Sequence, residues 1–175
     1  MELNEIALNF EIAGVPVIVR PHGEGHINLT YFVETDKGAK YILQKINNTL
    51  FSDVAALMRN IELVTSHIAK KNAAENKPSS CLTIVKTKDG KAFLDENGEF
   101  YRMYDFIDDA IAYQSVSDPS LFYESAVAFG AFQIICRIST LLNLRKFCPI
   151  FIIRENVFRI LRRRLKPIKR AGRRA

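Results

Sequence analysis

The sequence predicts an α+β fold, in which an antiparallel sheet of about five strands has one long helix inserted after its third strand. Short runs rich in β-forming residues are separated by turn sequences such as Asp36-Lys37-Gly38, Asp89-Gly90 and Glu96-Asn97-Gly98. Residues 51–69 instead have apolar side chains at helical spacing. A chain of 175 residues has the usual length of one domain and is long enough to bury a core.

The first part of the chain predicts a short helix and then strands. Leu3, Ile6, Ala7 and Phe10 are spaced as on one face of a helix, and Gly14 ends it. The runs with strand character cover residues 15–21, 29–34, 40–46, 81–86, 91–94 and 100–107.

Two longer helices are expected. A polar linker, residues 70–80 with Pro78, follows the long helix. Asp118-Pro119 has the pattern of an N-cap with proline at the first helical position, and the helix that it opens runs toward Gln133. The apolar face of the long helix consists of Phe51, Val54, Met58, Ile61, Val64 and Ile68.

The loop between the first two strands is a candidate phosphate site. It contains Gly23, Gly25, His26 and Asn28. Glycines let backbone N–H groups approach phosphate oxygens closely. A plain hairpin without a ligand is the alternative for the two glycines. His26 is expected to be a loop residue and no metal ligand.

Lys45, on the third strand, is the candidate cation. We expect its side chain to point toward the glycine loop, where a lysine can contact the α- and β-phosphates of a nucleotide. A surface lysine without a ligand is the alternative. Glu62 on the long helix is the candidate carboxylate that holds Lys45, and a solvated helix face is the alternative for Glu62. Asp105, Phe106 and Ile107 then form a hinge whose backbone pairs with the adenine edge.

Several longer motifs resemble one known family. The order of glycine loop, lysine-bearing strand, helix and further strands is that of a protein-kinase-like N-lobe. The amino-acid sequences of these motifs resemble the aminoglycoside-phosphotransferase family, in the branch that includes N-acetylhexosamine 1-kinase. The resemblance covers residues 1–133, the first part of such an enzyme. It rests on G-E-G-H-I-N-L-T-Y, Y-I-L-Q-K-I-N, L-M-R-N-I-E-L-V-T-S-H-I, Y-R-M-Y-D-F-I and A-V-A-F-G-A-F-Q.

The resemblance implies a division of the chain and a set of ligands. Residues 1–107 are the expected kinase-like N-lobe, and residues 108–133 the hinge and the first helix of a helical lobe. The family uses ATP and Mg²⁺ and transfers phosphate to sugars or amino sugars, so a nucleotide and a sugar are the implied partners. The sequence departs from the family at Arg59, where an acidic residue is expected. The partner of Lys45 therefore stays open between Glu62 and another group.

The catalytic loop of the family, H-x-D-x-x-x-x-N, has no counterpart in this sequence. His22 is followed two residues later by Glu24, His26 by Asn28 and His67 by Ala69, and no aspartate follows residue 133. The base that accepts the substrate proton and the ligands of Mg²⁺ are thus missing. We expect a truncated phosphotransferase that holds the ATP-binding lobe, lacks the Mg²⁺ site and is inactive alone.

Residues 134–175 differ sharply in composition from what precedes them. They hold 13 of the 25 Lys and Arg but one of the 19 Asp and Glu. Our main interpretation is a shift of the reading frame after about residue 133, because codons that fit this tail also permit an acidic, helical continuation in another frame. The alternative is a true basic arm that makes the chain a nucleic-acid-binding or membrane-surface-binding module. No aromatic residues interleave Arg162-Arg163-Arg164 and Lys169-Arg170 as in single-strand binders, so nucleic acid is the weaker expectation.

Composition argues against a membrane-spanning, secreted, disulfide-bonded or zinc-binding protein. No apolar run is long enough to span a membrane, and the acidic N-terminus is no signal peptide. Cys81, Cys136 and Cys148 form no C-x-x-C pair, which favours a reducing cytoplasm over a disulfide or zinc protein. Relatives of this branch have been labelled mucin desulfatase. Cys148-Pro149 lacks the spacing of the sulfatase C-x-P-x-R motif, so we regard that label as inherited.

The frameshift interpretation predicts what the gene contains. An alternative frame that opens near codon 134 should continue as a kinase lobe with an H-x-D motif, and sequencing codons 130–180 and beyond is the check. A gene in which neither alternative frame continues in this way would favour the basic arm.

Overall fold

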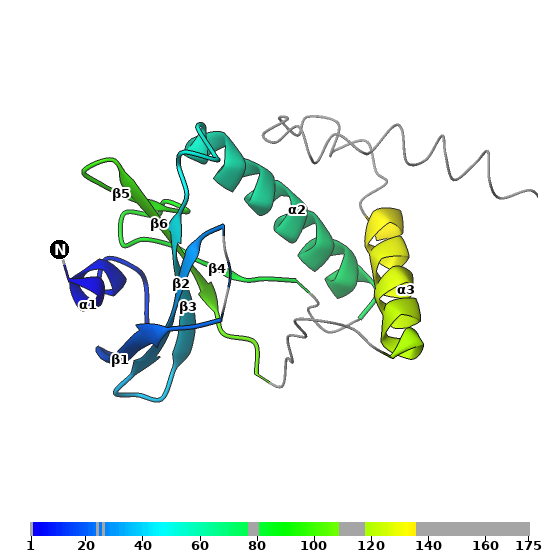
Figure 1. Cartoon of the computed structure of the whole chain (residues 1–175), viewed down its shortest axis with the longest axis horizontal. Coiled ribbons are helices and arrows are strands. Elements are labelled where there is room, and N and C mark those ends of the chain that lie inside the picture. Colours follow the sequence, from blue (N-terminus) through cyan, green and yellow to red (C-terminus); the bar gives the residue numbers. More distant parts are fainter. Residues whose placement is uncertain (1, 24, 26, 77–80, 109–117, 136–175) are drawn as a thin grey trace, which may run out of the picture. The chain divides into compact units, whose positions relative to one another are not determined.

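A computed structural model describes residues 2–23, 25, 27–76, 81–108 and 118–135. Its sheet and helices confirm the α+β class (Figure 1). The sheet has six strands where about five were expected. The elements in chain order are α1 (Leu3–Ala7), β1 (Pro16–Pro21), β2 (Leu29–Thr35), β3 (Lys40–Ile46), α2 (Val54–Ala74), β4 (Ile84–Val85), β5 (Leu94–Glu96), β6 (Glu99–Asp105) and α3 (Pro119–Ile135).

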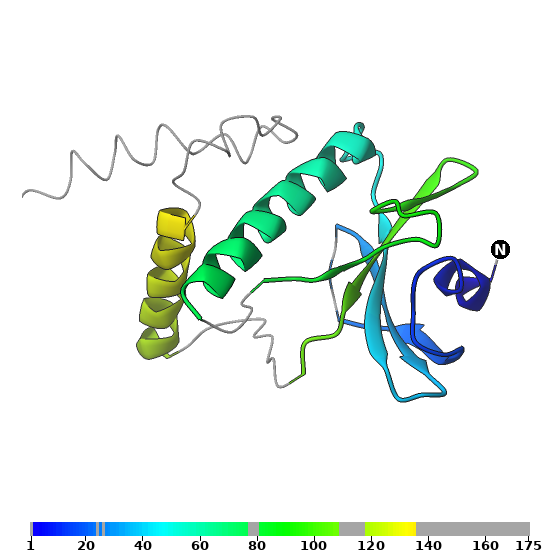
Figure 2. The ribbon, with the colours of Figure 1, turned by 180° about the vertical axis from the view of Figure 1, so that it is seen from behind.

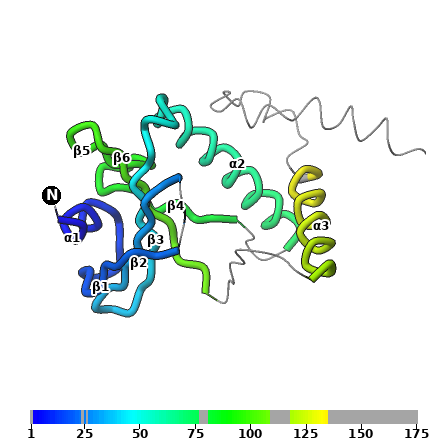
Figure 3. Tube along the Cα trace, viewed as in Figure 1, coloured from blue at the N-terminus to red at the C-terminus, as the bar shows by residue number. Residues whose placement is uncertain are grey.

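The six strands form one antiparallel sheet in the order β1-β2-β3-β6-β4, with β5 also paired to β6. β5 pairs with the first half of β6 and β4 with its second half. The helix α2 occupies the connection between β3 and β4, as the sequence predicts (Figure 3). This connection places β6 beside β3 in the middle of the sheet.

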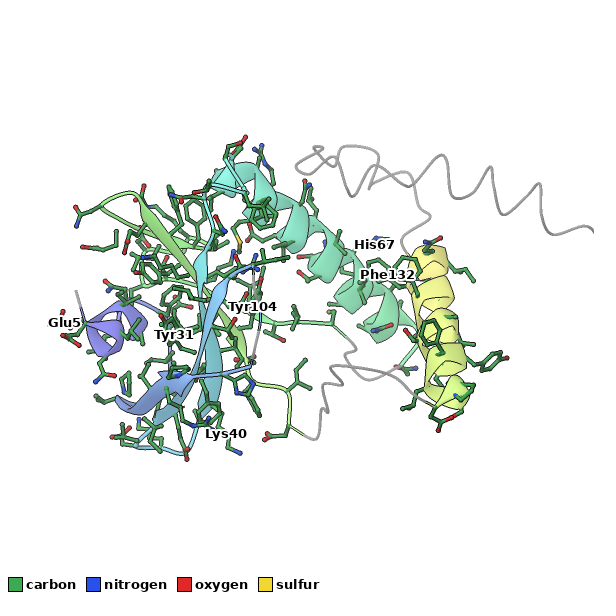
Figure 4. The ribbon with its side chains drawn as sticks, in the orientation of Figure 1. Glu5, Tyr31, Lys40, His67, Tyr104 and Phe132 are labelled. Carbon is green, nitrogen blue, oxygen red and sulfur yellow. The ribbon has the colours of Figure 1, made fainter. Side chains whose placement is uncertain are left out.

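The two faces of the sheet have different partners (Figure 2). Successive side chains of a strand point to opposite faces. On the face that we call the α1 face, Leu43 and Met103 pack with Phe10 and residues of α1. On the other face, the α2 face, Ile46 packs with Met58 of α2. Figure 4 shows Tyr31 and Tyr104 on these two sides of the sheet.

Some boundaries differ from the sequence prediction. β4 covers two residues because the next segment pairs with the N-terminal part instead: Glu11 N–H donates to the Lys86 carbonyl and Lys88 N–H to the Asn9 carbonyl, both at 2.8 Å. β5 begins at Leu94, later than the expected strand at residues 91–94. The tight turn at Asn97 and Gly98, with φ of 55° and 82°, pairs the residues just before it with the first residues of β6.

The long helix also differs at both ends. It begins at Val54, after Asp53, whose side chain accepts a hydrogen bond from Ala56 N–H at 2.9 Å. It continues to Ala74, through part of the expected polar linker, because lysine and alanine are good helix formers. Phe51 lies before the helix but still packs against its apolar cluster.

The start of α3 is as predicted. Asp118 Oδ1 accepts a hydrogen bond from Ser120 N–H at 2.8 Å, and Pro119 is the first helical residue. The helix ends at Ile135. The expectations for residues 136–175 lie outside the described residues. Within the described part of the chain, no helix is long and apolar enough to cross a membrane.

Leu43 lies at the centre of the α1-face core and is 0% exposed. Leu43→Ala should lower the free energy of unfolding by about 2–5 kcal/mol, because it removes buried methyl groups and leaves a cavity. Leu63→Ala on α2 is the matched control, since Leu63 is 37% exposed and alanine favours a helix. Urea denaturation of both variants is the measurement. Equal losses would contradict the placement of the core.

Candidate functional site

The loop between β1 and β2 encloses a small hollow. His22 N–H donates to the Thr30 carbonyl at 2.9 Å and closes the base of the loop. The hollow has a volume of about 160 Å³. Pockets for whole small molecules measure about 300–1,000 Å³, so this one has the size of a subsite. Its lining residues are Pro21, His22, Gly23, Gly25, Asn28, Leu29, Thr30 and Tyr31.

Three of the four predicted loop residues line this hollow. Gly23 has a φ of +73°, a left-handed conformation that side chains rarely adopt. A Cβ on Gly25 would come no closer than 3.8 Å to the Asn28 carbonyl oxygen. Asn28 Oδ1 accepts a hydrogen bond from Asn47 N–H at 3.0 Å, which ties the loop to the end of β3. His26 lies outside the described residues.

Three rings gather on the α2 face beside this loop. The ring centroids of Phe32 and Phe106 lie 5.2 Å apart, and His22 lies 6.1 Å from Phe32 and 5.8 Å from Phe106. The Arg20 guanidinium lies over the Phe32 ring, 4.7 Å from its centroid. Phe32 is buried, while His22 and Phe106 are half-buried. The two half-buried rings of this cluster, those of His22 and Phe106, lie next to each other, and His22 also lines the hollow.

The predicted hinge residues follow β6 directly. Asp105 N–H donates to the Thr83 carbonyl and Phe106 N–H to the Lys40 carbonyl, both at 3.1 Å. Ile107 is exposed, and its N–H makes no hydrogen bond within the described residues. Burial raises the pKa of the Asp105 carboxyl above its usual value. Of the three hinge N–H groups, that of Ile107 is the one that has no hydrogen-bond partner among the described residues.

Lys45 lies on β3 as predicted, but its side chain does not point toward the glycine loop. In the register of β3 and β6, Lys45 is opposite Tyr101, whose side chain belongs to the α1-face core. Lys45 Nζ pairs with Glu99 of β6 and lies 6.0 Å from the Tyr101 ring centroid. β6 flanks β3 on the side away from β2, so Lys45 is directed away from the loop.

Lys45 and Tyr101 both act on the ionisation of Glu99. Hydrogen bonds from Lys45 and from the Tyr101 hydroxyl, at 2.9 Å, hold the pKa of the Glu99 carboxyl below its usual value. Burial and the bond to Glu99 raise the pKa of Tyr101 to about 12. Lys45 is therefore the cation of an ion pair within the sheet.

Glu62 also differs from the expectation that it pairs with Lys45. Glu62 Oε1 accepts a hydrogen bond from Lys86 Nζ, and both side chains are about one third exposed. α2 lies on the face opposite Lys45, so strand alternation keeps Glu62 and Lys45 apart. The two predicted partners thus belong to two separate pairs.

A polar row that the sequence analysis missed crosses the α2 face. Thr30 on β2, Gln44 on β3 and Arg102 on β6 are partners in register on three adjacent strands. Gln44 Nε2 donates to Thr30 Oγ1, and Arg102 Nε donates to Gln44 Oε1, each at 3.0 Å. Because Thr30 lines the hollow, the row links Arg102 to the glycine loop.

Arg102 is the charged member of this row. Its guanidinium carbon lies 5.3 Å from the centroid of the Tyr104 ring, and Nη1 lies 3.9 Å from Met58 Sδ of α2. Burial lowers the pKa of the guanidinium below its usual value, which still leaves the group charged at neutral pH. Burial likewise raises the pKa of Tyr104. No carboxylate of the described residues forms an ion pair with Arg102.

Strand alternation was the signal that could have revealed this row. Residues 44 and 45 point to opposite faces, so only one of them can share a face with the long helix. As for metals, no group of three His, Cys, Asp or Glu that could hold an ion occurs among the described residues.

Comparison with solved structures finds a likeness over part of the chain. No protein-family model matches the chain. The chain is similar to an aminoglycoside phosphotransferase from Alicyclobacillus acidocaldarius subsp. acidocaldarius DSM 446, with 12% identity and a TM-score of 0.37. The match covers 61% of this chain and 27% of that one, so the chain spans about a quarter of that structure.

The ion pair at Lys45 gives a direct prediction. Lys45→Gln should raise the pKa of the Glu99 carboxyl toward its usual value of 4.5, because the largest cause of its depression is removed. In the parent chain, the stabilisation from this depressed pKa is present above pH 4.5 and is lost as the pH falls through the folded pKa of Glu99. The pKa of Glu99 in the parent and in Lys45→Gln is measured from its carboxyl ¹³C chemical shift through an acid titration. An unchanged pKa would show that Lys45 lies elsewhere.

Proposed function

We propose that this chain is the nucleotide-binding lobe of an ATP-dependent phosphotransferase. The observation that carries the proposal is the hollow at the glycine loop together with the ring cluster, which runs from His22 beside the hollow to Phe106 of the hinge. Backbone N–H groups that surround a small concavity suit phosphate oxygens. A flat apolar surface suits a purine ring.

Each part of a nucleotide has a candidate contact. The rings of His22 and Phe106 are placed for stacking with adenine, and Ile107 N–H is the hinge donor for its edge. The loop with Gly23 and Gly25 would cover the phosphates. The acceptor that we propose is a sugar or amino sugar, and this rests on the sequence resemblance to the N-acetylhexosamine kinase branch.

Phosphate transfer needs parts that these 175 residues do not supply. The sequence contains no H-x-D motif, and the described residues contain no group of ligands that fits Mg²⁺. We therefore assign no step to a metal ion here, and propose that the chain by itself binds nucleotide without transferring phosphate. The proposed compartment is the cytoplasm, where a thiol such as that of Cys81 stays reduced.

The proposal predicts nucleotide binding that depends on the glycine loop. ATP should bind the full chain in isothermal titration calorimetry, and Gly23→Val should weaken binding at least about tenfold, because valine is strained at a φ of +73°. Gly90→Val is the matched control, since Gly90 has a φ of +79° in a turn outside the hollow. No phosphorylated N-acetylhexosamine should form.

Two results would contradict this proposal. The first is a parent chain that binds no ATP. The second is equal loss of binding in the two glycine variants, which would show that the loop has no special role. Measurable phosphate transfer by the chain alone would overturn the proposed lack of activity while leaving nucleotide binding in place.

A further inference from the structure

We infer that Arg102, rather than Lys45, is the cation that binds the phosphates of the nucleotide, an inference that rests on the proposed function. The inference comes from the cross-strand row of Thr30, Gln44 and Arg102 on the α2 face. It assigns a binding role to a residue that motif spacing does not indicate.

The lysines near the site already have carboxylate partners. Lys45 pairs with Glu99, Lys86 with Glu62, and Lys40 with Asp108 at 3.1 Å. A phosphate would have to compete with each carboxylate. Arg102 has no such competitor among the described residues, so its charge is available to an anion.

Arg102 is also held in a fixed position. Nε donates to Gln44 Oε1, and the guanidinium carbon lies over the Tyr104 ring, 5.3 Å from its centroid. This leaves the terminal N–H groups, of which one at Nη1 faces only the weak acceptor Met58 Sδ. Terminal N–H groups of a guanidinium form paired hydrogen bonds with phosphate oxygens. A half-buried cation gains more from an anionic partner than an exposed cation does, because water screens the pair less there.

The row gives Arg102 a route to the glycine loop. Gln44 contacts both Arg102 and Thr30, and Thr30 lines the hollow. Neighbouring strands lie about 4.8 Å apart, so β6 and β2 are separated by about two such spacings. A chain of two or three phosphates that enters the hollow can therefore extend along the row toward the guanidinium. The ligand class is a polyphosphate, either as part of a nucleotide or free.

The test compares charge-removing variants of the full chain. ATP and inorganic tripolyphosphate are titrated calorimetrically into the parent, Arg102→Gln, Lys45→Gln and Lys91→Gln at fixed salt. Lys91 is the matched control for loss of one charge, because it is exposed and pairs with Asp89 at 2.5 Å in a turn outside the hollow. The basic residues 134–175 are the same in every variant, so any contribution from them cancels.

We expect Arg102→Gln to weaken both ligands at least about tenfold, and the two lysine variants to change affinity less than about twofold. Arg102→Lys should recover part of the loss, since it restores the charge without the paired donors. Arg102→Gln that binds like the parent would overturn the inference and leave the proposed function standing. A loss of affinity in Lys45→Gln equal to that in Arg102→Gln would also overturn the inference and leave the proposed function standing.

Two further results separate the inference from the proposed function. Arg102-dependent binding of tripolyphosphate, with no preference for ATP, would support the inference and contradict the nucleotide-binding lobe. A parent that binds neither ligand overturns both. If Arg102→Gln does not fold, as judged by circular dichroism, an NMR titration of the parent chain still tests the inference. The Nε–Hε resonance of Arg102 should shift on addition of tripolyphosphate, and a resonance that does not move would refute the inference.

Discussion

The pairing of β3 with β2 on one side and β6 on the other is the constraint on which the site depends. This register aligns Thr30, Gln44 and Arg102 in one row and Leu29, Lys45 and Tyr101 in the next. Because side chains of neighbouring rows point to opposite faces, the first row shares a face with α2 and the second shares a face with α1. A slip of one residue would exchange the two sets and bury Lys45 under α2.

The same register determines where charge is neutralised. Lys45 and Glu99 lie near the surface, where an ion pair contributes little to stability and is screened by salt. Arg102 lies deeper, against Met58 and Tyr104, where an unpartnered charge is costly. A fold that keeps such a charge two strands away from a glycine loop, at the other end of a polar row, favours a ligand that supplies the missing anion. The hollow shares Thr30 with the polar row and His22 with the ring cluster.

Much of this fold follows from the sequence. The limits of β3, the turn at Gly38 and the cap of α3 at Asp118 were predicted, because turn and cap residues act through local geometry. The orientation of Lys45 was not predictable in the same way. β3 has apolar residues on both faces, as Ile42 and Leu43 show, so its pattern does not say which face meets the helix. The partners of Lys45 and Glu62 depend on that choice. Glu62 was one candidate partner of Lys45, with a solvated helix face as its alternative, and it pairs with Lys86 instead. Arg102 was missed for the same reason, since only pairing across two strands connects it to the loop.

The most direct test of this account is the structure of the chain bound to a non-hydrolysable ATP analogue. The account predicts adenine against Phe106, phosphates under the loop at Gly23 and Gly25, and at least one phosphate oxygen within hydrogen-bond distance of the Arg102 guanidinium, while Lys45 stays paired with Glu99. Phosphates bound by Lys45 on the α1 face, with Arg102 free of ligand, would contradict it.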